Sequence, residues 1–253
     1  MHPTLNTIIE STKKRLPAYS YRKGRVSSRS LKESIREKNR QNLIPLIAEV
    51  KPSSPTKFIR KVTPIDAAEI ALQMEAAGVA GISVLTEPHF FKGSHENLNY
   101  VRKVVKIPVL RKDFIIDKAQ IHEIDSDLIL LIAGILGDSL SDFVDEALTS
   151  GREPLVEVHD QKELECALCT RTNIIGINNR DLTTMNVDIS TTEKLAPLAD
   201  KRIIISESGI SNPNDAVRMI DAGADAILVG TSIMQGDIYE KTYEIVHALK
   251  QRI

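Results

Sequence analysis

From residue 43 onward, short runs of aliphatic and β-branched residues alternate with longer amphipathic segments, and this alternation constrains the fold more than any other feature of the chain. Such a pattern is typical of βα units, which build parallel sheets. The runs 128–132 and 203–205 are continuously apolar, as expected for strands buried on both faces. We expect eight strands, at about residues 44–51, 80–86, 107–112, 127–133, 153–158, 174–179, 202–207 and 226–230.

Eight βα units predict an α/β protein, a (β/α)8 TIM barrel with an N-terminal helical extension. The chain has 253 residues, which matches the usual size of one such barrel of about 250 residues. We therefore expect a single domain over residues 1–253, with the extension in residues 1–42 and the barrel in residues 43–253.

The extension is polar and basic and carries two helical patterns. Apolar residues recur at helical spacing between residues 5 and 16, and Ser30 with Glu33 indicates a capping box that opens a second helix ending near residue 39. The basic segment 19–28 between them predicts a surface loop. The extension can cover the bottom of the barrel or pack beside its mouth, and we favour the mouth.

Cap residues and glycines mark the boundaries of the barrel helices. Gly78 and Gly223 follow similar helical segments, where a left-handed residue lets the chain turn into the next strand. The expected helix starts carry Asp, Asn or Thr caps, in two cases followed by Pro. They are Thr63, Asp138, Asp160, Asn212 and Asp237.

Charge and composition narrow the function classes. Lys and Arg total 33 against 34 Asp and Glu, a formal net charge of -1, so no global field favours nucleic acid or an anionic membrane. The sequence lacks an apolar run of the roughly 20 residues that span a bilayer and a basic-then-apolar signal pattern. We expect a cytoplasmic enzyme that binds neither nucleic acid nor membrane.

The chain has two cysteines, Cys166 and Cys169, in a C-x-x-C spacing. They lie within a helical pattern, without a second cysteine pair or a strand-to-helix redox context, so we interpret them as reduced thiols rather than as a metal or redox site. We expect no metal and no disulfide framework.

Charged residues at the ends of the expected strands are the candidates for catalysis. A parallel barrel gathers the carboxyl ends of its strands around one mouth, so Lys51 and Lys112 are expected to meet Glu49, Glu157 and Glu207 there. Burial and a like-charged neighbour lower the pKa of a lysine, which suits it to act as a general acid, whereas a carboxylate can keep it charged and oriented. The three glutamates can supply one general base and partners for the lysines. The structural alternative is a lattice of salt bridges that closes the mouth.

Two consecutive strand ends suggest a phosphate site. The segments 206–210 and 228–232 each contain a glycine, Gly209 and Gly230, that lets backbone N–H groups approach a ligand. In barrels of this type the loops after strands seven and eight often bind phosphate. Plain turn chemistry is the alternative at either loop taken alone.

Further polar residues lie in loops at the same end. The segment after the first strand contains Ser54 between Lys51 and Lys57, and it can close over a phosphorylated substrate or form an ordinary surface turn. Asn178 can bond a polar substrate group and Arg180 can neutralise an anion. Either side chain can equally bond loop carbonyl groups.

Taken together, these segments resemble the indole-3-glycerol-phosphate synthase family. The resemblance runs from about residue 43 to residue 234 and implies conversion of 1-(2-carboxyphenylamino)-1-deoxyribulose 5-phosphate into indole-3-glycerol phosphate. Carbon dioxide and water are lost, and the resemblance implies no metal or organic cofactor. The blocks that carry it are residues 47–51, 83–87 with 90–94, 108–114, 155–159, 176–182 and 206–210.

The resemblance also implies roles. Lys112 would be the general acid for ring closure, Glu157 would act in the dehydration, and Lys51 would hold the substrate carboxylate or share the acid role. Residues that would shape the site around them are Glu49, Asn178, Glu207 and Ser208. Residues that would bind the phosphate are Ser54, Arg180, Gly209, Gly230 and Thr231, and residues that would line an aromatic pocket are Phe91, Phe114 and Leu131.

The sequence departs from the family pattern after Lys51. The family commonly has a second cation there and a glycine in the following turn, whereas this chain has Pro52 and the segment 54–58 without glycine.

Two other functions fit the same fold. One is a barrel isomerase acting on a phosphorylated amino sugar, which would place a Cys or Asp pair at strand ends. The other is a non-catalytic barrel that binds phosphosugars, which would lose the lysines. The expected partner in each case is a small phosphorylated molecule, and the sequence is compatible with a monomer.

Overall fold

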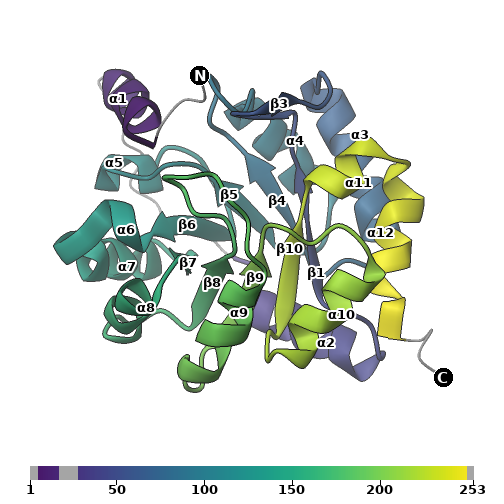
Figure 1. Ribbon diagram of the computed structural model, residues 1–253. Coiled ribbons are helices and arrows are strands. Elements are labelled where there is room, and N and C mark those ends of the chain that lie inside the picture. Colours follow the sequence, from purple (N-terminus) through teal and green to yellow (C-terminus); the bar gives the residue numbers. More distant parts are fainter. Residues whose placement is uncertain (1–4, 17–27, 250–253) are drawn as a thin grey trace.

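The computed structural model describes residues 5–16 and 28–249, and within these ranges eight parallel strands close into a barrel (Figure 1). The order around the ring is β1-β10-β9-β8-β7-β6-β5-β4, and β4 pairs with β1 to close it. The predicted (β/α)8 fold is confirmed, and each strand lies within its expected range. The strands are β1 (Leu46–Val50), β4 (Gly81–Leu85), β5 (Val109–Lys112), β6 (Leu128–Ile132), β7 (Glu153–Val158), β8 (Ile174–Asn178), β9 (Ile203–Glu207) and β10 (Ala226–Val229).

Side chains along each strand alternate between the barrel interior and the layer of helices. The interior cluster contains Ile47, Leu110, Leu155 and Ile205, whereas residues next to them in sequence pack outward. Because the period is two, the residue two positions after an interior aliphatic residue also faces inward. This register brings Glu49, Lys112, Glu157 and Glu207 to the inside of the barrel at the carboxyl ends of their strands.

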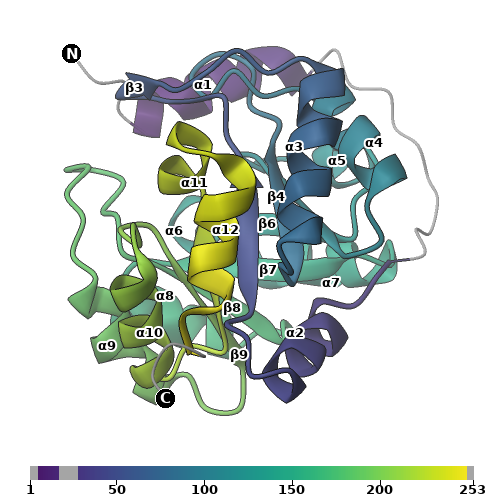
Figure 2. The ribbon, with the colours of Figure 1, turned by 90° about the vertical axis from the view of Figure 1, so that its right-hand side faces the viewer.

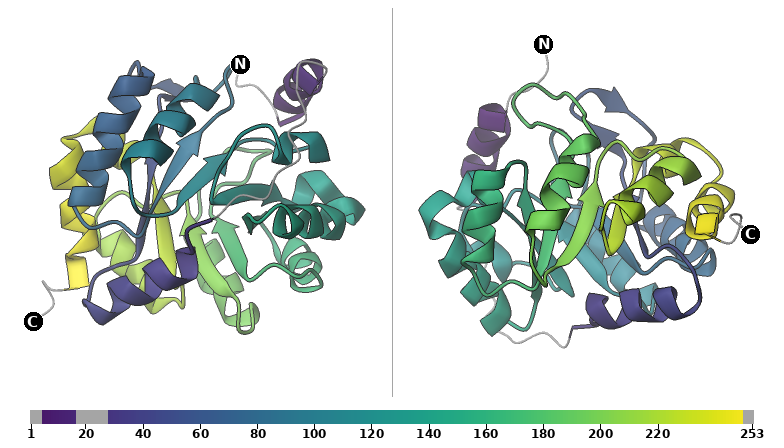
Figure 3. Two further views of the ribbon diagram at one scale, coloured as in Figure 1. Left: turned by 180° about the vertical axis from the view of Figure 1, so that it is seen from behind. Right: turned by 60° about the horizontal axis from the view of Figure 1, so that its bottom comes forward.

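Helices surround the barrel, as the views in Figures 2 and 3 show. Among the described residues, no helix is both long and apolar enough to cross a bilayer. The helices are α1 (Leu5–Arg15), α2 (Leu31–Arg40), α3 (Pro64–Ala76), α4 (His95–Val104), α5 (Lys118–Ile121), α6 (Ala133–Leu136), α7 (Leu140–Thr149), α8 (Gln161–Leu168), α9 (Ser190–Leu195), α10 (Pro213–Asp221), α11 (Thr231–Gln235) and α12 (Ile238–Val246).

Most of the predicted helix boundaries are confirmed. Thr63, Asp160, Asn212 and Asp237 are N-caps whose side chains accept hydrogen bonds from the first turn. Gly78 and Gly223 both have a φ of 101°, as a left-handed turn requires.

The prediction for Asp138 is wrong, because helix α6 begins directly at the end of β6 and Asp138 lies in the 3-10 turn that follows it. The exposed thiol of Cys166 lies on α8, and Cys169 directly follows that helix.

The two N-terminal helices lie at opposite ends of the barrel (Figures 1 and 2). Helix α1 packs Ile8 into the same apolar cluster as Phe114, at the carboxyl ends of the strands, and Arg15 pairs with Asp113 at 3.5 Å. The expected packing beside the mouth is therefore correct for α1 but not for α2. Of the expected loop 19–28, residues 19–27 lie outside the described ranges.

Helix α2 covers the amino ends of the strands. Ser30 caps the helix as predicted, and its hydroxyl also donates to Glu153 Oε1 at 3.0 Å, while the backbone N–H of Leu31 donates to Glu153 Oε2 at 2.9 Å. The side chain of Leu31 packs into the interior cluster at the amino ends of the strands.

Asp127 connects several segments at the amino ends of the strands through hydrogen bonds. Its buried carboxylate accepts hydrogen bonds from the Arg29 backbone N–H at 3.1 Å, the Arg29 side chain at 2.9 Å, Arg102 at 3.0 Å and the Val109 backbone N–H at 2.9 Å. One side chain thereby links the segment before α2, helix α4 and strand β5.

We expect Asp127→Ala to lower the free energy of unfolding by about 3–5 kcal/mol. The change leaves buried hydrogen-bond donors without an acceptor and removes the counter-charge of two arginines. Urea denaturation measures the change. Asp145→Ala is the matched control, because its pair with Arg171 at 3.1 Å is largely solvent-exposed and should contribute less than about 1 kcal/mol. Equal urea midpoints for the two variants would contradict the role given to Asp127.

Candidate active site

A cavity of about 180 Å³ opens at the carboxyl ends of the strands. Its lining combines charged side chains from β1, β5 and β7 with apolar side chains from α1 and β6. The structure therefore brings most of the predicted site residues to one place. Those that line the cavity are Glu49, Lys51, Ser54, Phe91, Lys112, Phe114, Glu157, Asn178, Arg180, Ser208 and Thr231.

The central feature of this cavity is an ion pair across the barrel. Lys112 Nζ lies 2.8 Å from Glu207 Oε2 and 3.5 Å from Glu49 Oε1, and Lys51 Nζ lies 3.2 Å from Glu49 Oε2. Strands β5 and β9, which carry Lys112 and Glu207, stand opposite each other in the ring order. The two lysines thus converge on Glu49, as expected from barrel closure.

Two glycines make room for these carboxylates. A side chain at Gly176 on β8 would collide with Glu207 Oε1, and one at Gly230 after β10 would collide with Glu49. Glu207 itself is fully buried below the cavity, in contact with Lys112 rather than with the cavity surface. Gly230 therefore has a packing role that the sequence pattern of a phosphate loop does not reveal.

The charges around Lys112 reverse the expected direction of its pKa. Burial alone disfavours the ammonium group, but the carboxylates of Glu207, Glu49 and Glu157 outweigh that effect, so the pKa of Lys112 lies above its ordinary value. The expectation of a lowered pKa is wrong, because the carboxylates that were expected to keep the lysine charged outweigh both burial and the neighbouring lysine. Lys112 is a protonated donor throughout the physiological range.

The carboxylates of the site differ in pKa. Burial raises the pKa of Glu207 to about 7, with Glu157 and Glu49 adding to the rise and Lys112 opposing it. Burial also acts against the charge of Glu49, but Lys51 and Lys112 prevail and hold its pKa below the usual value. Glu207 and Glu49 thus have pKa values shifted in opposite directions because their neighbours differ.

Glu157 is held by two neighbours. Asn178 Nδ2 donates to Glu157 Oε1 at 3.1 Å, and His159 Nε2 lies 3.4 Å from the same oxygen. Burial opposes ionisation of this carboxyl, but the contact with His159 and the charge of Lys112 prevail and lower its pKa to about 2. The sequence reasoning missed His159, although it stands two residues after Glu157 and so shares the inward register.

An apolar wall completes the cavity. The rings of Phe91 and Phe114 lie 5.9 Å apart between centroids, and Leu130 lines the cavity near them. The prediction for Leu131 is wrong, because in a strand with a period of two its neighbour Leu130 faces the interior and Leu131 packs against the helices. Phe91 is placed by Glu87, whose buried carboxylate accepts its backbone N–H at 2.9 Å.

The residues predicted to bind phosphate lie in the segments that follow β1, β8, β9 and β10, which are consecutive strands in the ring. Ser208 and Gly209 both have positive φ, 67° and 81°, so the chain after β9 makes a tight turn at the cavity edge. Arg180 is half-buried and donates to the Met185 carbonyl at 2.9 Å. Ser54 lies in the short hairpin of β2 (Ser53–Ser54) and β3 (Lys57–Phe58), where its hydroxyl accepts the Lys57 N–H at 3.1 Å.

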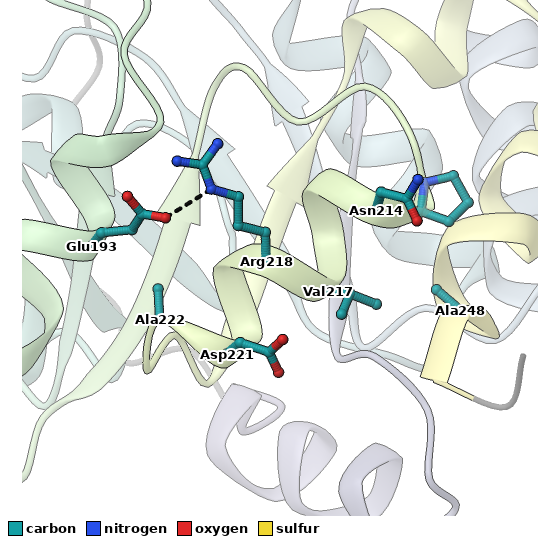
Figure 4. A pocket seen from close by; sticks show the side chains of 8 residues that line it. Glu193, Asn214, Val217, Arg218, Asp221, Ala222 and Ala248 are labelled. Carbon is teal, nitrogen blue, oxygen red and sulfur yellow. Dashed lines mark hydrogen bonds and ion pairs between the residues drawn. The ribbon is translucent and has the colours of Figure 1, made fainter. Parts of the chain in front are cut away.

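A larger depression, of about 590 Å³, lies on the outer surface between α9, α10 and the end of α12 (Figure 4). The exposed pair of Arg218 and Glu193, at 2.7 Å, lies on its lining. It has none of the inward-facing strand-end groups that meet in the mouth, so we place the candidate active site in the smaller cavity.

The family model and the relatives found by sequence comparison agree with one another. The model of the family described as indole-3-glycerol phosphate synthase matches residues 4–245. The chain is 42% identical over 245 residues to a protein of that name from Halobacterium salinarum, covering 96% of both chains. It is 43% identical over 225 residues to one from Methanocaldococcus jannaschii, covering 87% of this chain and 82% of that one.

Solved structures resemble it in fold. N-acetylmannosamine-6-phosphate 2-epimerase from Clostridium perfringens aligns with a TM-score of 0.59 at 18% identity, covering 75% of this chain and 87% of that one. (S)-3-O-geranylgeranylglyceryl phosphate synthase from Thermoplasma acidophilum has the same TM-score and identity, with 88% and 99% covered. At this identity the likeness concerns the barrel alone.

The contact of Lys112 with Glu207 predicts a change in titration. In Lys112→Met we expect the pKa of Glu207 to rise from about 7 by roughly one to three units, because its nearest cation is lost. Carboxyl carbon NMR or infrared spectroscopy over a pH range from about 5 to about 11 measures it. Lys51→Met is the control, because Lys51 pairs with Glu49 instead. A Glu207 titration that is the same in both variants would refute the assigned pairing.

Proposed function

The chain belongs to the indole-3-glycerol phosphate synthase family, whose members are carboxy-lyases of tryptophan biosynthesis, and we propose that it catalyses that reaction by lysine and glutamate acid-base chemistry. The substrate would be 1-(2-carboxyphenylamino)-1-deoxyribulose 5-phosphate and the product indole-3-glycerol phosphate. The observation that carries the mechanism is the meeting of Lys112 with Glu49 and Glu207 inside the mouth.

Ring closure needs a proton donor at the ketone. The aromatic carbon that bears the carboxylate attacks the ketone carbon, and the ketone oxygen takes up a proton as the carbon–carbon bond forms. Lys112 is the donor in this proposal, since the surrounding carboxylates keep it protonated and a hydrogen bond to Glu207 fixes its position. Loss of carbon dioxide then restores the aromatic ring.

Dehydration needs a donor and an acceptor. The hydroxyl leaves with a proton, and a second proton leaves the carbon next to the nitrogen, which completes the indole. Glu157 is the acceptor in this proposal, because its pKa of about 2 keeps it as a carboxylate. Lys51, which also lines the cavity, supplies the proton to the leaving hydroxyl or pairs with the substrate carboxylate.

The ring order of the strands supports one orientation of the substrate. Phe114 follows β5 and Leu130 belongs to β6, on the side of the barrel opposite β9 and β10. The aromatic ring of the substrate would lie against this apolar side. Its phosphate would then lie at the edge formed by Arg180, Ser208 and Thr231, with backbone N–H groups after β9 and β10.

The positions of the two cysteines argue against the alternative function, an amino-sugar phosphate isomerase. Cys166 and Cys169 are exposed on the outer helical layer, away from the cavity lining.

The direct test of the proposed function is incubation of the purified protein with the carboxyphenylamino-deoxyribulose phosphate while indole fluorescence is followed. Absence of product would refute the proposal.

Replacing either group of the proposed acid-base pair should stop turnover without unfolding the barrel. We expect Lys112→Met and Glu157→Gln each to lower kcat by at least about a hundredfold, the usual scale for a general acid or base. Steady-state kinetics and circular dichroism measure the two properties. Near-normal turnover in Lys112→Met would remove this lysine from the mechanism.

Arg180 should act on binding rather than on chemistry. We expect Arg180→Ala to raise KM by about tenfold or more while kcat changes less, because a charge-assisted contact to phosphate is lost from both ground state and transition state. Arg171→Ala, at an exposed pair on the outer surface, is the control. An unchanged KM in Arg180→Ala would contradict the anion role.

A further inference from the structure

Glu157 is one end of a chain of three ionisable groups that leads out of the cavity to helix α8. His159 Nε2 lies 3.4 Å from Glu157 Oε1, and His159 Nδ1 lies 3.0 Å from Glu163 Oε2. The same oxygen of Glu163 also accepts the backbone N–H of His159 at 2.9 Å. Glu163 thereby holds both the main chain and the ring of His159.

The position of Glu163 is itself fixed by two elements. It lies in the first turn of α8, after the N-cap Asp160, whose side chain accepts the Glu163 backbone N–H at 2.8 Å. Its other carboxylate oxygen fills the space where a side chain at Gly134 on α6 would stand. The imidazole orientation is therefore set from outside the strand that carries the catalytic glutamate.

We propose that His159 is a positioning residue, which aims the Glu157 carboxylate into the cavity and keeps it ionised through the chain Glu157–His159–Glu163. This inference rests on the proposed function of Glu157 as the proton acceptor in the dehydration. His159 does not touch the reacting atoms in this scheme. It acts through the glutamate two residues before it, and Asn178 holds the same oxygen from the neighbouring strand at 3.1 Å.

The surroundings of His159 favour its cationic form. The charged groups that face it are Glu157 on its own strand, Glu163 on α8 and Asp181 in the segment after β8. Burial alone lowers the pKa of His159, but Glu157 and Glu163 together raise it to about 10. The ring is thus an imidazolium at neutral pH, where Glu157 is a carboxylate.

The test compares His159→Leu with the wild-type protein on the carboxyphenylamino-deoxyribulose phosphate. We expect kcat to fall by at least about tenfold, because a catalytic group displaced by a fraction of an ångström loses much of its rate. KM should change by less than about threefold, because the proposed phosphate and aromatic contacts are intact. The acidic limb of kcat should move to higher pH, because the pKa of Glu157 rises when the cation is lost.

His122→Leu is the matched control. It removes another mostly buried histidine paired with a glutamate, with His122 Nε2 2.6 Å from Glu146 Oε1, but outside the cavity lining. We expect a comparable loss of stability and an acidic limb at the wild-type position. A purely structural role of His159 would make the two variants alike, and that result would overturn the proposal.

Glu163→Gln tests the same chain with almost unchanged shape, should His159→Leu fold poorly. Nitrogen-15 NMR of the imidazole should show the pKa of His159 falling in this variant, with a smaller decrease of kcat than in His159→Leu. Unchanged His159 titration and unchanged kcat would refute the inference. Wild-type protein that forms no product would instead refute the proposed function, so the two failures are distinguishable.

Discussion

The ion pair between Lys112 and Glu207 is the interaction on which the candidate site depends. The two residues belong to strands on opposite sides of the ring, yet their side chains meet at 2.8 Å, so the pair exists only when the barrel is closed. Glu207 is removed from water and Lys112 is largely buried, and a buried carboxylate without a cation is costly. Closure of the sheet and assembly of the acid-base groups are therefore the same event.

Two positions of the backbone around this cluster leave room for its carboxylates. Gly176 and Gly230 leave space that the carboxylates of Glu207 and Glu49 occupy, and an alanine at either position would push an acid away from its lysine. An apolar interior of the same shape would be expected to fold at least as stably. Stability therefore does not account for the charged groups at the top of this interior, and the apolar layers below them provide the stability.

The period-two register explains both what the sequence could predict and where it failed. Their places at strand ends predicted that Glu49, Lys112 and Glu157 meet at the mouth, and the register turns each of them inward. It could not separate Leu130 from Leu131, because a strand buried on both faces is apolar at every position and its parity cannot be read from composition. His159 was missed for another reason: its partner Glu163 comes from α8, and the position of a helix against a strand is not a property of either segment alone. The pKa of Lys112 likewise required the distances to three carboxylates.

The protons on Lys112 and Glu207 are linked, and this linkage bears on how a lysine with a raised pKa can act as an acid. Glu207 titrates near neutral pH and is the nearest of the carboxylates that raise the pKa of Lys112. A proton on Glu207 removes that charge, so the ammonium group becomes a stronger acid without any movement of the backbone. Glu157 raises the pKa of both groups but itself stays a carboxylate, because His159 and Asn178 contact it. The proposed donor Lys112 and the proposed acceptor Glu157 therefore keep separate protonation states within one small cavity, because different neighbours surround each of them.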